Sequence, residues 1–537
     1  METFRYFGPL DIEVRRARGL GEDGRARLWE RAPPEEECAM SAIGSADPEV
    51  RVTTGRLRGR MEDGVAVFRG VPFARPPVGA LRLAAPVPSE PWDGVREAGV
   101  FGPPPPQSRV LGASGTSGDW LTVNVWSPDL GAARLPVMVW IHGGGYMYGW
   151  SGDPVFDGRV LAREGVIVVT FNYRVSAEGF GHFQGAPANR GLLDQVAALR
   201  WVHDNIAAFG GDPDRVTVFG ESAGAGSIAA LMAMPRAAGL FRRAIAQSVP
   251  GLFFSAELAA DIAAALAGEL DLAPLAGELA RLSPERLIDA GDAVADKMGG
   301  CPRWGRAAYV QTPFAPVVDG EVLPAVPWRS LADGAARDVE LIVGHTRDEY
   351  RLFMAIRGDI GQITAERAAT ALRELAPDPE AYRAAYPGAD EERLYELVHS
   401  DWMFRMPSVR LAEIHQRRGR AHLYELTWPA PGMGGDALGA CHGLGLPLTF
   451  GNLTAGAAGL LLGQEPPPAA AELSARVRAA WIAFATTGDP GWPTYEPQNR
   501  HTWVIDTEPV ITAYREETSR ELWAGHAFAP LTLRARP

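Results

Sequence analysis

One strand–turn–helix segment in the middle of the chain constrains the fold more than any other. Residues 216–219 form a short apolar run of strand type, and residues 223–234 are mostly small residues with helical character. Ser222 stands between them, with a glycine two positions away on each side. This pattern is typical of a nucleophile elbow, whose tight turn exposes a serine hydroxyl at a helix N-terminus. The alternative, in a chain with 61 glycines, is a glycine-rich turn without a catalytic role; the flanking strand and helix favour a nucleophile.

Apolar runs and helical periodicity alternate along the chain. Residues 137–141 and 166–172 are continuous apolar, β-branched runs, which are typical of strands buried on both faces of a sheet. Apolar residues recur at helical spacing over residues 192–209. The alternation predicts an α/β fold with a large, mostly parallel central sheet flanked by helices. Further strands are expected at residues 340–344 and 422–428, and further helices at about 256–298, 361–385 and 470–487.

The sequence also bounds the folded unit. Residues 1–48 are polar, rich in Arg and Glu and interrupted by Gly and Pro, so we expect a loosely ordered N-terminal extension. From about residue 50, two short strands are expected, joined by a hairpin turn at Asp63 and Gly64. Neither an internal repeat nor a low-complexity linker divides the rest, so residues 49–537 are predicted to form a single domain.

Charge and cysteine content exclude several partners and cofactors. The net charge of −13 would make a nucleic acid or an anionic membrane surface repel the chain. Cys38, Cys301 and Cys441 are far apart and predict neither a disulfide framework nor a zinc site. The first residues lack the apolar core of a signal peptide, and the apolar runs are too short to span a bilayer. We therefore expect a cytoplasmic protein that needs no membrane, metal or cofactor.

A glycine-rich loop directly after the strand at 137–141 is a candidate oxyanion hole. It reads His142-Gly-Gly-Gly145 and lies about 80 residues before Ser222. A tetrahedral intermediate needs fixed N–H donors aimed at its oxygen, and glycines let a backbone present them. The N–H of Ala223, which follows the serine, is expected to be a further donor. The alternative is a merely flexible loop, but two independent motifs in the expected order favour the oxyanion hole.

A serine at an elbow needs a histidine and an acid, which are expected in the order serine, acid, histidine. His442 stands in a glycine-rich loop after the strand at 422–428, which is where a catalytic histidine is usually found. Asp348 and Glu349 follow the strand at 340–344, and spacing alone does not choose between them. Among the other histidines after Ser222, two are expected to be solvated on charged helices, one to begin a strand and one to lie in a polar turn: His399 and His415, His422, and His501, respectively.

The motifs together resemble the type-B carboxylesterase/lipase family, which includes cholinesterases, bacterial p-nitrobenzyl-type esterases and the non-catalytic neuroligins. The resemblance runs in family order from about residue 50 to about residue 506. Besides the loop of His442, the matching stretches are FRGVPFA (68–74), NVWSP (124–128), WIHGGG (140–145), NYR (172–174), GLLDQ (191–195), NIAAFGGDP (205–213), FGESAG (219–224), PVVDG (316–320) and RDE (347–349).

The resemblance implies an α/β-hydrolase fold and assigns roles to residues. It implies a catalytic triad of Ser222, Glu349 and His442, and so favours Glu349 over Asp348, which then becomes a helix cap or a surface charge. It implies oxyanion-hole donors and supporting residues as follows: Gly144, Gly145 and Ala223 as donors, Ser248 as a hydrogen-bond partner of the Glu/His pair, and Glu221 as a buried structural acid.

The chain departs from the family pattern at four positions. Pro105 and Trp120 stand where the family has two cysteines that bound a loop, which agrees with a reducing cytoplasm. Gly445 replaces a glutamate that the family has three residues after the catalytic histidine, here His442. Tyr350 replaces the glycine of an Asp-Glu-Gly motif. These changes remove no member of the triad, so they bear on substrate preference and on pKa values rather than on the reaction.

The predicted activity is hydrolysis of small carboxylic esters through an acyl-enzyme intermediate. The alternatives are an amidase, carbamate or thioester hydrolase on the same triad, or a non-catalytic binding protein. The last is disfavoured because neuroligins have lost the serine that this chain keeps. The expected assembly is a monomer or a weak homodimer. Candidate walls of a substrate pocket are the apolar residues Tyr146, Phe253, Phe254, Phe314, Leu352, Phe353, Met403, Phe404 and Leu444.

Overall fold

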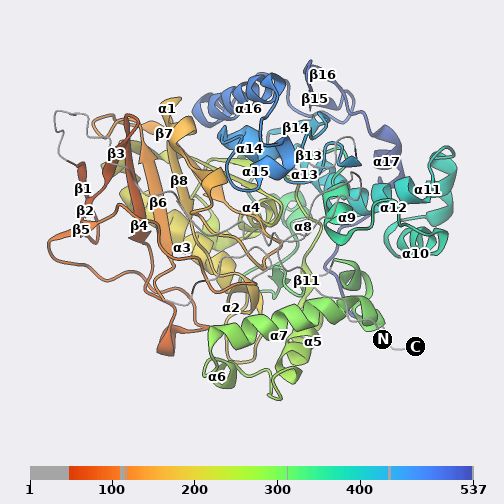
Figure 1. Ribbon diagram of the computed structural model, residues 1–537, viewed down its shortest axis with the longest axis horizontal. Helices are drawn as coiled ribbons and strands as arrows, with labels where there is room; N and C mark the ends of the chain where they lie inside the picture. The colour runs from red at the N-terminus through yellow and green to blue at the C-terminus, as the bar shows by residue number, and fades with distance from the viewer. Residues whose placement is uncertain (1–46, 109–114, 116–117, 311, 433–436, 535–537) are drawn as a thin grey trace, which may run out of the picture.

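The computed structural model describes residues 47–108, 115, 118–310, 312–432 and 437–534 (Figure 1). The predicted extension, residues 1–48, lies outside the described residues except for Asp47 and Pro48. The first strand, β1, begins at Glu49, where the predicted domain begins.

The centre of the molecule is a mixed eleven-stranded sheet in the order β16-β15-β14-β13-β10-β9-β7-β8-β6-β4-β3. Pairing is parallel from β15 through β14, β13, β10, β9 and β7 to β8, and antiparallel at both ends of the sheet. The prediction of a parallel core is therefore confirmed. The strands are β3 Arg60–Glu62, β4 Val65–Pro72, β6 Thr122–Ser127, β7 Leu135–Ile141, β8 Ile167–Phe171, β9 Gly211–Glu221, β10 Arg243–Gln247, β13 Glu340–Thr346, β14 Ala421–Leu426, β15 His501–Ile505 and β16 Val510–Ala513.

The predicted hairpin turn is confirmed, but its strands differ from the expectation. Asp63 and Gly64 have φ angles of 49° and 81° and join β3 to β4. The stretch before them is not one strand: β1 (Glu49–Val52) and β2 (Gly55–Arg58) form a hairpin of their own. With β5 (Val95–Glu97) they make a separate three-stranded sheet, and β11 (Phe254–Ser255) pairs with β12 (Val317–Val318).

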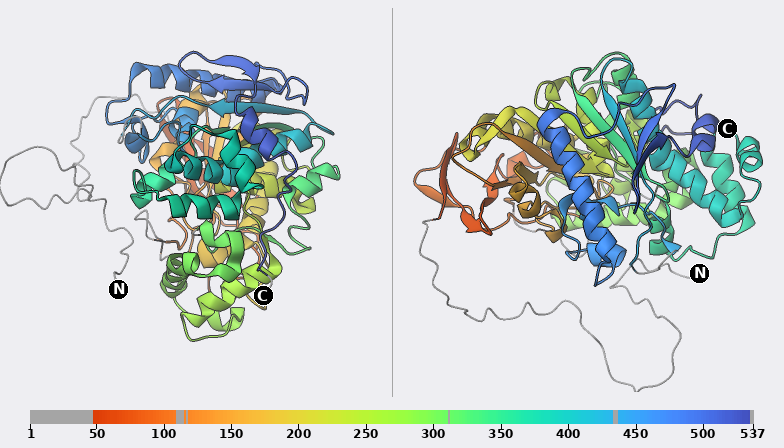
Figure 2. Two further views of the ribbon diagram at one scale, coloured as in Figure 1. Left: turned by 90° about the vertical axis from the view of Figure 1, so that its right-hand side faces the viewer. Right: turned by 90° about the horizontal axis from the view of Figure 1, so that it is seen from above.

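Helices cover both faces of the central sheet (Figure 2). The side chains of β7 alternate between two cores: Val139 and Ile141 belong to one, and Met138 and Trp140 to the other. This alternation follows from the two-residue period of a strand. The first core is covered by α3 Arg190–Asn205, α4 Ala223–Ala233, α8 Pro327–Ala332 and α13 Met406–His415, and the second by α1 Arg159–Arg163, α14 Gly445–Phe450, α15 Ala458–Leu462 and α16 Pro468–Thr487.

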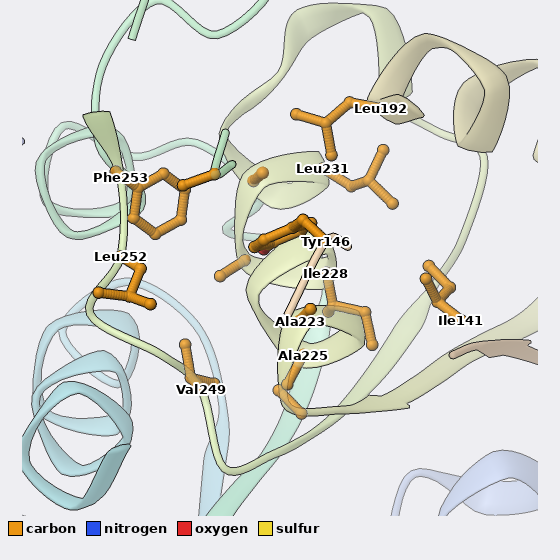
Figure 3. Close-up of a cluster of buried hydrophobic side chains, with 14 of the residues drawn as sticks. Ile141, Tyr146, Leu192, Ala223, Ala225, Ile228, Leu231, Val249, Leu252 and Phe253 are labelled. Carbon is orange, nitrogen blue, oxygen red and sulfur yellow. The ribbon is translucent and has the colours of Figure 1, made fainter. Parts of the chain in front are cut away.

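Every residue of helix α4 is buried, and Figure 3 shows apolar side chains from α4 and from neighbouring elements. Its small residues let neighbouring elements approach closely, and its larger side chains Ile228 and Leu231 lie among apolar residues of the first core. It ends at Ala233, because Pro235 disfavours a helical conformation at the preceding residue. The predicted strand–turn–helix segment is thus confirmed.

Two further groups of helices lie outside the central sheet in Figure 1, one within residues 256–297 at the bottom and one within residues 351–400 at the right. The predicted helical stretches 256–298 and 361–385 are each divided, because prolines interrupt them or begin a new helix at Pro274, Pro284 and Pro379. No helix in the described part of the chain has the length and apolarity of a membrane span. The remaining helices are α2 Ser176–Phe180, α5 Ala256–Gly268, α6 Ala276–Leu279, α7 Pro284–Lys297, α9 Arg351–Arg357, α10 Ala365–Leu375, α11 Pro379–Ala385, α12 Glu391–Ser400 and α17 Glu517–Leu522, the π-helical turn η8 Asp401–Arg405, and the 3₁₀ turns η1 Gly79–Leu81, η3 Pro154–Phe156, η4 Ile206–Phe209, η5 Pro235–Ala237, η6 Met298–Gly300 and η7 Pro302–Tyr309.

Candidate active site

Ser222 lies at the turn between β9 and α4 in a strained backbone conformation, with φ 56° and ψ −124°. Its N–H donates a hydrogen bond to the carbonyl oxygen of Gln247 over 2.9 Å, which fixes the turn to the end of β10. Gly224 is required by close approach: a Cβ there would lie 2.0 Å from the carbonyl oxygen of Ile141. Because strain of this kind persists only where the surroundings impose it, the turn is built to present the serine.

The loop after β7 brings Gly144 and Gly145 to the same end of the sheet. Gly144 has φ 109°, and a Cβ there would lie 2.0 Å from the carbonyl oxygen of Tyr148. Thr312 Oγ1 donates to the carbonyl oxygen of Gly145 over 2.8 Å, which helps to hold the loop. Among the described residues, none accepts a hydrogen bond from the N–H of Gly144 or Gly145. Together with Ala223, which begins α4, the two glycines have the positions expected of oxyanion-hole donors.

The structure brings His442 and Glu349 together. Nδ1 of His442 lies 2.6 Å from Oε2 of Glu349, and both side chains are buried. Asp348 is not the helix cap or surface charge that the resemblance implies: its side chain is only 7% exposed and accepts a hydrogen bond from the N–H of Ala440 over 3.0 Å. Arg347 and Arg393 form ion pairs with it. Asp348 therefore ties down the loop that carries His442, a role that depends on a contact between distant parts of the chain.

The charged form of Glu349 is stabilised by its surroundings. The N–H of Thr346 donates to Oε1 of Glu349 over 2.9 Å, and the hydroxyl of Ser248 also hydrogen-bonds to this carboxylate. Burial by itself would raise the pKa of Glu349, but the charge and hydrogen bond of His442, with those of Ser248 and Thr346, lower that pKa below its ordinary value. Ser248 thus occupies the place that the resemblance implies for it.

Glu221 lies at the other nitrogen of the imidazole, which the sequence interpretation missed. Its Oε1 is 3.2 Å from Nε2 of His442. Burial raises the pKa of Glu221 to about 7; the charge of His442 opposes this rise and that of Glu349 adds to it. Burial lowers the pKa of His442, but the two carboxylates outweigh it and raise that pKa above its ordinary value. No hydrogen bond joins Ser222 Oγ to Nε2 of His442 among the described residues; catalytic hydrogen bonds of this kind often tighten only when substrate is bound.

Two of the candidate pocket residues cover the imidazole. The ring centroids of Phe404 and Phe353 lie 4.3 Å and 5.2 Å from that of His442. Phe404 lies in the π-helical turn η8, and its ring stacks on that of Phe353 at 5.9 Å. Single π-helical turns occur often at functional sites. No pattern in the sequence predicts this turn.

The other candidate pocket residues lie elsewhere in the hydrophobic cores or line a small cavity away from His442. Phe254 and Phe314 line a small cavity together with Phe180. Tyr146 packs against Phe180, and Phe253 packs against Trp328. The last three candidates belong to the hydrophobic cores or pack against them: Leu352, Met403 and Leu444.

The remaining histidines have structural contacts. His399 and His415, expected to be solvated, are only 1% and 2% exposed and are hydrogen-bonded to backbone oxygens of Tyr395 and Val339. His415 contacts the segment before β13 and His399 stacks on Tyr350, and the pattern of a single helix reveals neither contact. His422 lies in β14 as expected, whereas His501 begins β15 instead of lying in a turn.

The structure also shows the contacts of the residues that depart from the family pattern. Tyr350 stacks on His399 with ring centroids 4.2 Å apart, and its hydroxyl accepts a hydrogen bond from Arg357. Pro105 and Trp120 are buried, and Gly445 begins α14. Of the cysteines, Cys301 and Cys441 are unpaired, and Cys38 lies outside the described residues. Within the described ranges, no cluster of three or more His, Cys, Asp or Glu side chains is arranged to hold a metal ion.

Comparisons with known proteins show the family to which the chain belongs. The model of the carboxylesterase family matches residues 46–523. The para-nitrobenzyl esterase of Bacillus subtilis (strain 168) is 39% identical over 497 residues, which cover 88% of this chain and 97% of that protein. The phenmedipham hydrolase of Pseudarthrobacter oxydans is 37% identical over 488 residues, covering 87% and 96%.

Solved structures show the same fold. A PNB esterase structure superposes with a TM-score of 0.79 at 36% identity and covers 89% of this chain and 99% of its own. The carboxylesterase of Geobacillus stearothermophilus at pH 6.2 superposes with a TM-score of 0.79 at 34% identity, covering 88% and 99%. The expected α/β-hydrolase fold is confirmed.

Proposed function

The chain belongs to the carboxylesterase family and hydrolyses carboxylic esters as a serine esterase; we propose that Ser222 is its nucleophile, His442 its general base and Glu349 the acid that orients His442. The observation that carries the assignment is the 2.6 Å contact between Nδ1 of His442 and Oε2 of Glu349 at the end of the sheet where Ser222 lies. A carboxylate in this position fixes the imidazole tautomer that leaves Nε2 free to accept a proton.

The first half of the reaction forms an acyl-enzyme. Ser222 Oγ attacks the ester carbonyl while His442 Nε2 takes its proton. The negative charge that develops on the carbonyl oxygen is stabilised by N–H donors of the glycine loop and of α4, namely those of Gly144, Gly145 and Ala223. His442 then gives the proton to the leaving alcohol, and the ester C–O bond breaks.

The second half regenerates the enzyme. His442 Nε2 takes a proton from a water molecule, whose oxygen attacks the acyl carbon. The intermediate collapses, the bond to Ser222 Oγ breaks, and the serine recovers its proton from the imidazolium. Glu349 stays ionised throughout, which its lowered pKa favours at neutral pH.

The class of ester and the apolar wall of the active site are further parts of the proposal. We propose small aryl and benzyl esters as substrates, because the similar protein of Bacillus subtilis is a para-nitrobenzyl esterase. Phe353 and Phe404 would form an apolar wall beside the acyl carbon, since their rings cover His442. A monomer or weak homodimer in the cytoplasm stays a prediction from the sequence.

Covalent labelling tests the assignment of the nucleophile. A fluorophosphonate should label the protein once, and mass spectrometry should place the adduct on the peptide that contains Ser222. Labelling should be slowed about 10³-fold or more by Glu349→Gln, because the wrong imidazole tautomer is then favoured. An adduct on another residue, or equal labelling of the Glu349→Gln variant, would contradict the proposed triad.

A further inference from the structure

A small cavity lies beside the loop of His442, where the carboxyl ends of β9, β10 and β13 meet α14 and α16. Its lining includes Glu221, Gln247, Thr346, Gly445 and Trp481. Its volume is about 20 Å³, which is room for one water molecule. None of the proposed chemical steps uses this cavity.

Several residues of the lining carry buried polar atoms without a partner among the described residues. These atoms are Gln247 Nε2, Thr346 Oγ1 and Trp481 Nε1; Glu221 Oε1 likewise makes no hydrogen bond, and its neighbour is Nε2 of His442 at 3.2 Å. Glu221, Gln247 and Thr346 are only 6%, 3% and 5% exposed. The other end of the Gln247 amide is fixed, because its Oε1 accepts a hydrogen bond from Thr449 over 3.0 Å. Unsatisfied buried donors and acceptors around a space of this size are the usual setting of an ordered water.

Gly445 keeps the space open without being required by the backbone. Its φ is not in the left-handed region, and it is the first residue of α14. A Cβ at this position would meet nothing nearer than Oε1 of Gln247, at an ordinary contact distance of 3.7 Å. Since alanine would fit and favours a helix more than glycine does, the local structure gives no reason for glycine other than the space it leaves.

We propose that this cavity binds one ordered water molecule, which accepts a hydrogen bond from Gln247 Nε2 and donates one to Glu221 Oε1. Gln247 and Gly445 are then positioning residues, because they act on His442 only through the water and Glu221. This inference rests on the proposed role of His442 as the general base.

The water would stabilise the charged form of Glu221 beside Nε2 of His442. An anion at that position favours the imidazolium that forms when Ser222 is deprotonated. Removal of the water raises the pKa of Glu221, because a buried carboxylate loses a donor. Neutral Glu221 then no longer raises the pKa of His442. The titratable groups that face Glu221 from the surrounding elements are His442, Glu349, Tyr148, Tyr424 and Cys441.

The test compares pH profiles of kcat/KM for p-nitrophenyl acetate. Gly445→Ala and Gln247→Met should each move the acidic limb to lower pH by about half a unit or more, and lower the plateau several-fold. The control is Gly268→Ala, a helical glycine at the end of α5 with open space around its Cβ position, and it should match the wild type. In a Glu221→Gln background, Gly445→Ala should have no further effect, because the group through which the water acts is gone.

A crystal structure of the wild type should show the water within hydrogen-bond distance of Glu221 Oε1 and Gln247 Nε2, and that of Gly445→Ala should lack it. An unchanged pH profile in folded Gly445→Ala, or the absence of the water in the wild type, overturns the inference. Failure of the proposed triad is recognised separately, because fluorophosphonate labelling of Ser222 does not depend on this cavity.

Discussion

Oε1 of Glu221 lies 3.2 Å from Nε2 of His442, so the imidazole has a carboxylate at each of its two nitrogens. Glu349 at Nδ1 has a lowered pKa, whereas that of Glu221 is raised to about 7. The two acids therefore differ in charge around neutral pH: Glu349 stays ionised, and Glu221 gains or loses its proton in the range where His442 must act as a base.

Glu221→Gln should shift the acidic limb of kcat/KM to lower pH. In the wild type the charge of Glu221 raises the pKa of His442, so its removal lets His442 lose its proton at lower pH. We expect a shift of about one pH unit and a plateau about tenfold lower, because the imidazolium of the transition state loses a neighbouring anion. The measurement is a pH profile with p-nitrophenyl acetate. Exposed Glu465→Gln is the control, and a shift to higher pH would refute the account.

Gly144→Ala should lower kcat by about 10²- to 10³-fold, because the added Cβ displaces a donor of the proposed oxyanion hole. That Cβ would lie 2.0 Å from the carbonyl oxygen of Tyr148. Gly165→Ala is a matched control: Gly165 also has a positive φ, of 98°, but open space around its Cβ position. The measurements are steady-state kinetics and the melting temperature of each variant. Equal activity of the two variants would mean that the loop of Gly144 does not stabilise the transition state.

The burial of Glu425 predicts that the stability of the folded protein depends on pH, independently of catalysis. Both of its carboxylate oxygens are buried without a hydrogen-bond partner among the described residues. Burial, and then the charge of Glu516, raises its pKa to about 8, against the lowering effect of Arg405 and nearby arginines. The folded protein thus keeps a proton that the unfolded chain releases near pH 4.5, so this contribution to stability is full below pH 4.5 and is lost as the pH rises to about 8.

Glu425→Gln should therefore melt at a higher temperature than the wild type at pH 8 and gain little at pH 5. The neutral amide removes a difference on the order of 3 kcal/mol at neutral pH. Scanning fluorimetry at the two pH values measures this, with exposed Glu508→Gln as the control. An equal change in melting temperature at pH 5 and pH 8 would show that Glu425 is charged in the folded protein.

Local patterns in the sequence predict those parts of the fold that depend on neighbours along the chain. The elbow at Ser222 and the glycine loop after β7 are of this kind, because each is defined by a strand, a turn and their side-chain sizes. The hairpin turn at Asp63 and Gly64 is another. The resemblance to a family adds Glu349 and Ser248, which spacing alone does not distinguish from their neighbours.

Contacts between distant segments explain what the sequence interpretation missed. Asp348 has a charged neighbour on α12 and a backbone partner in the His442 loop, so it is buried where a surface role was expected. His399 reads as solvated along its own helix but lies against Tyr350. The π-helical turn that places Phe404 over His442 and the approach of Glu221 to Nε2 likewise arise only when the elements are assembled.

Hydrolysis of p-nitrophenyl acetate by purified wild type and Ser222→Ala tests the central claim most directly. We predict turnover by the wild type and a loss of at least about 10⁴-fold in kcat for the variant, with an unchanged melting temperature. Retention of most of the activity by folded Ser222→Ala would contradict the assignment of Ser222 as the nucleophile.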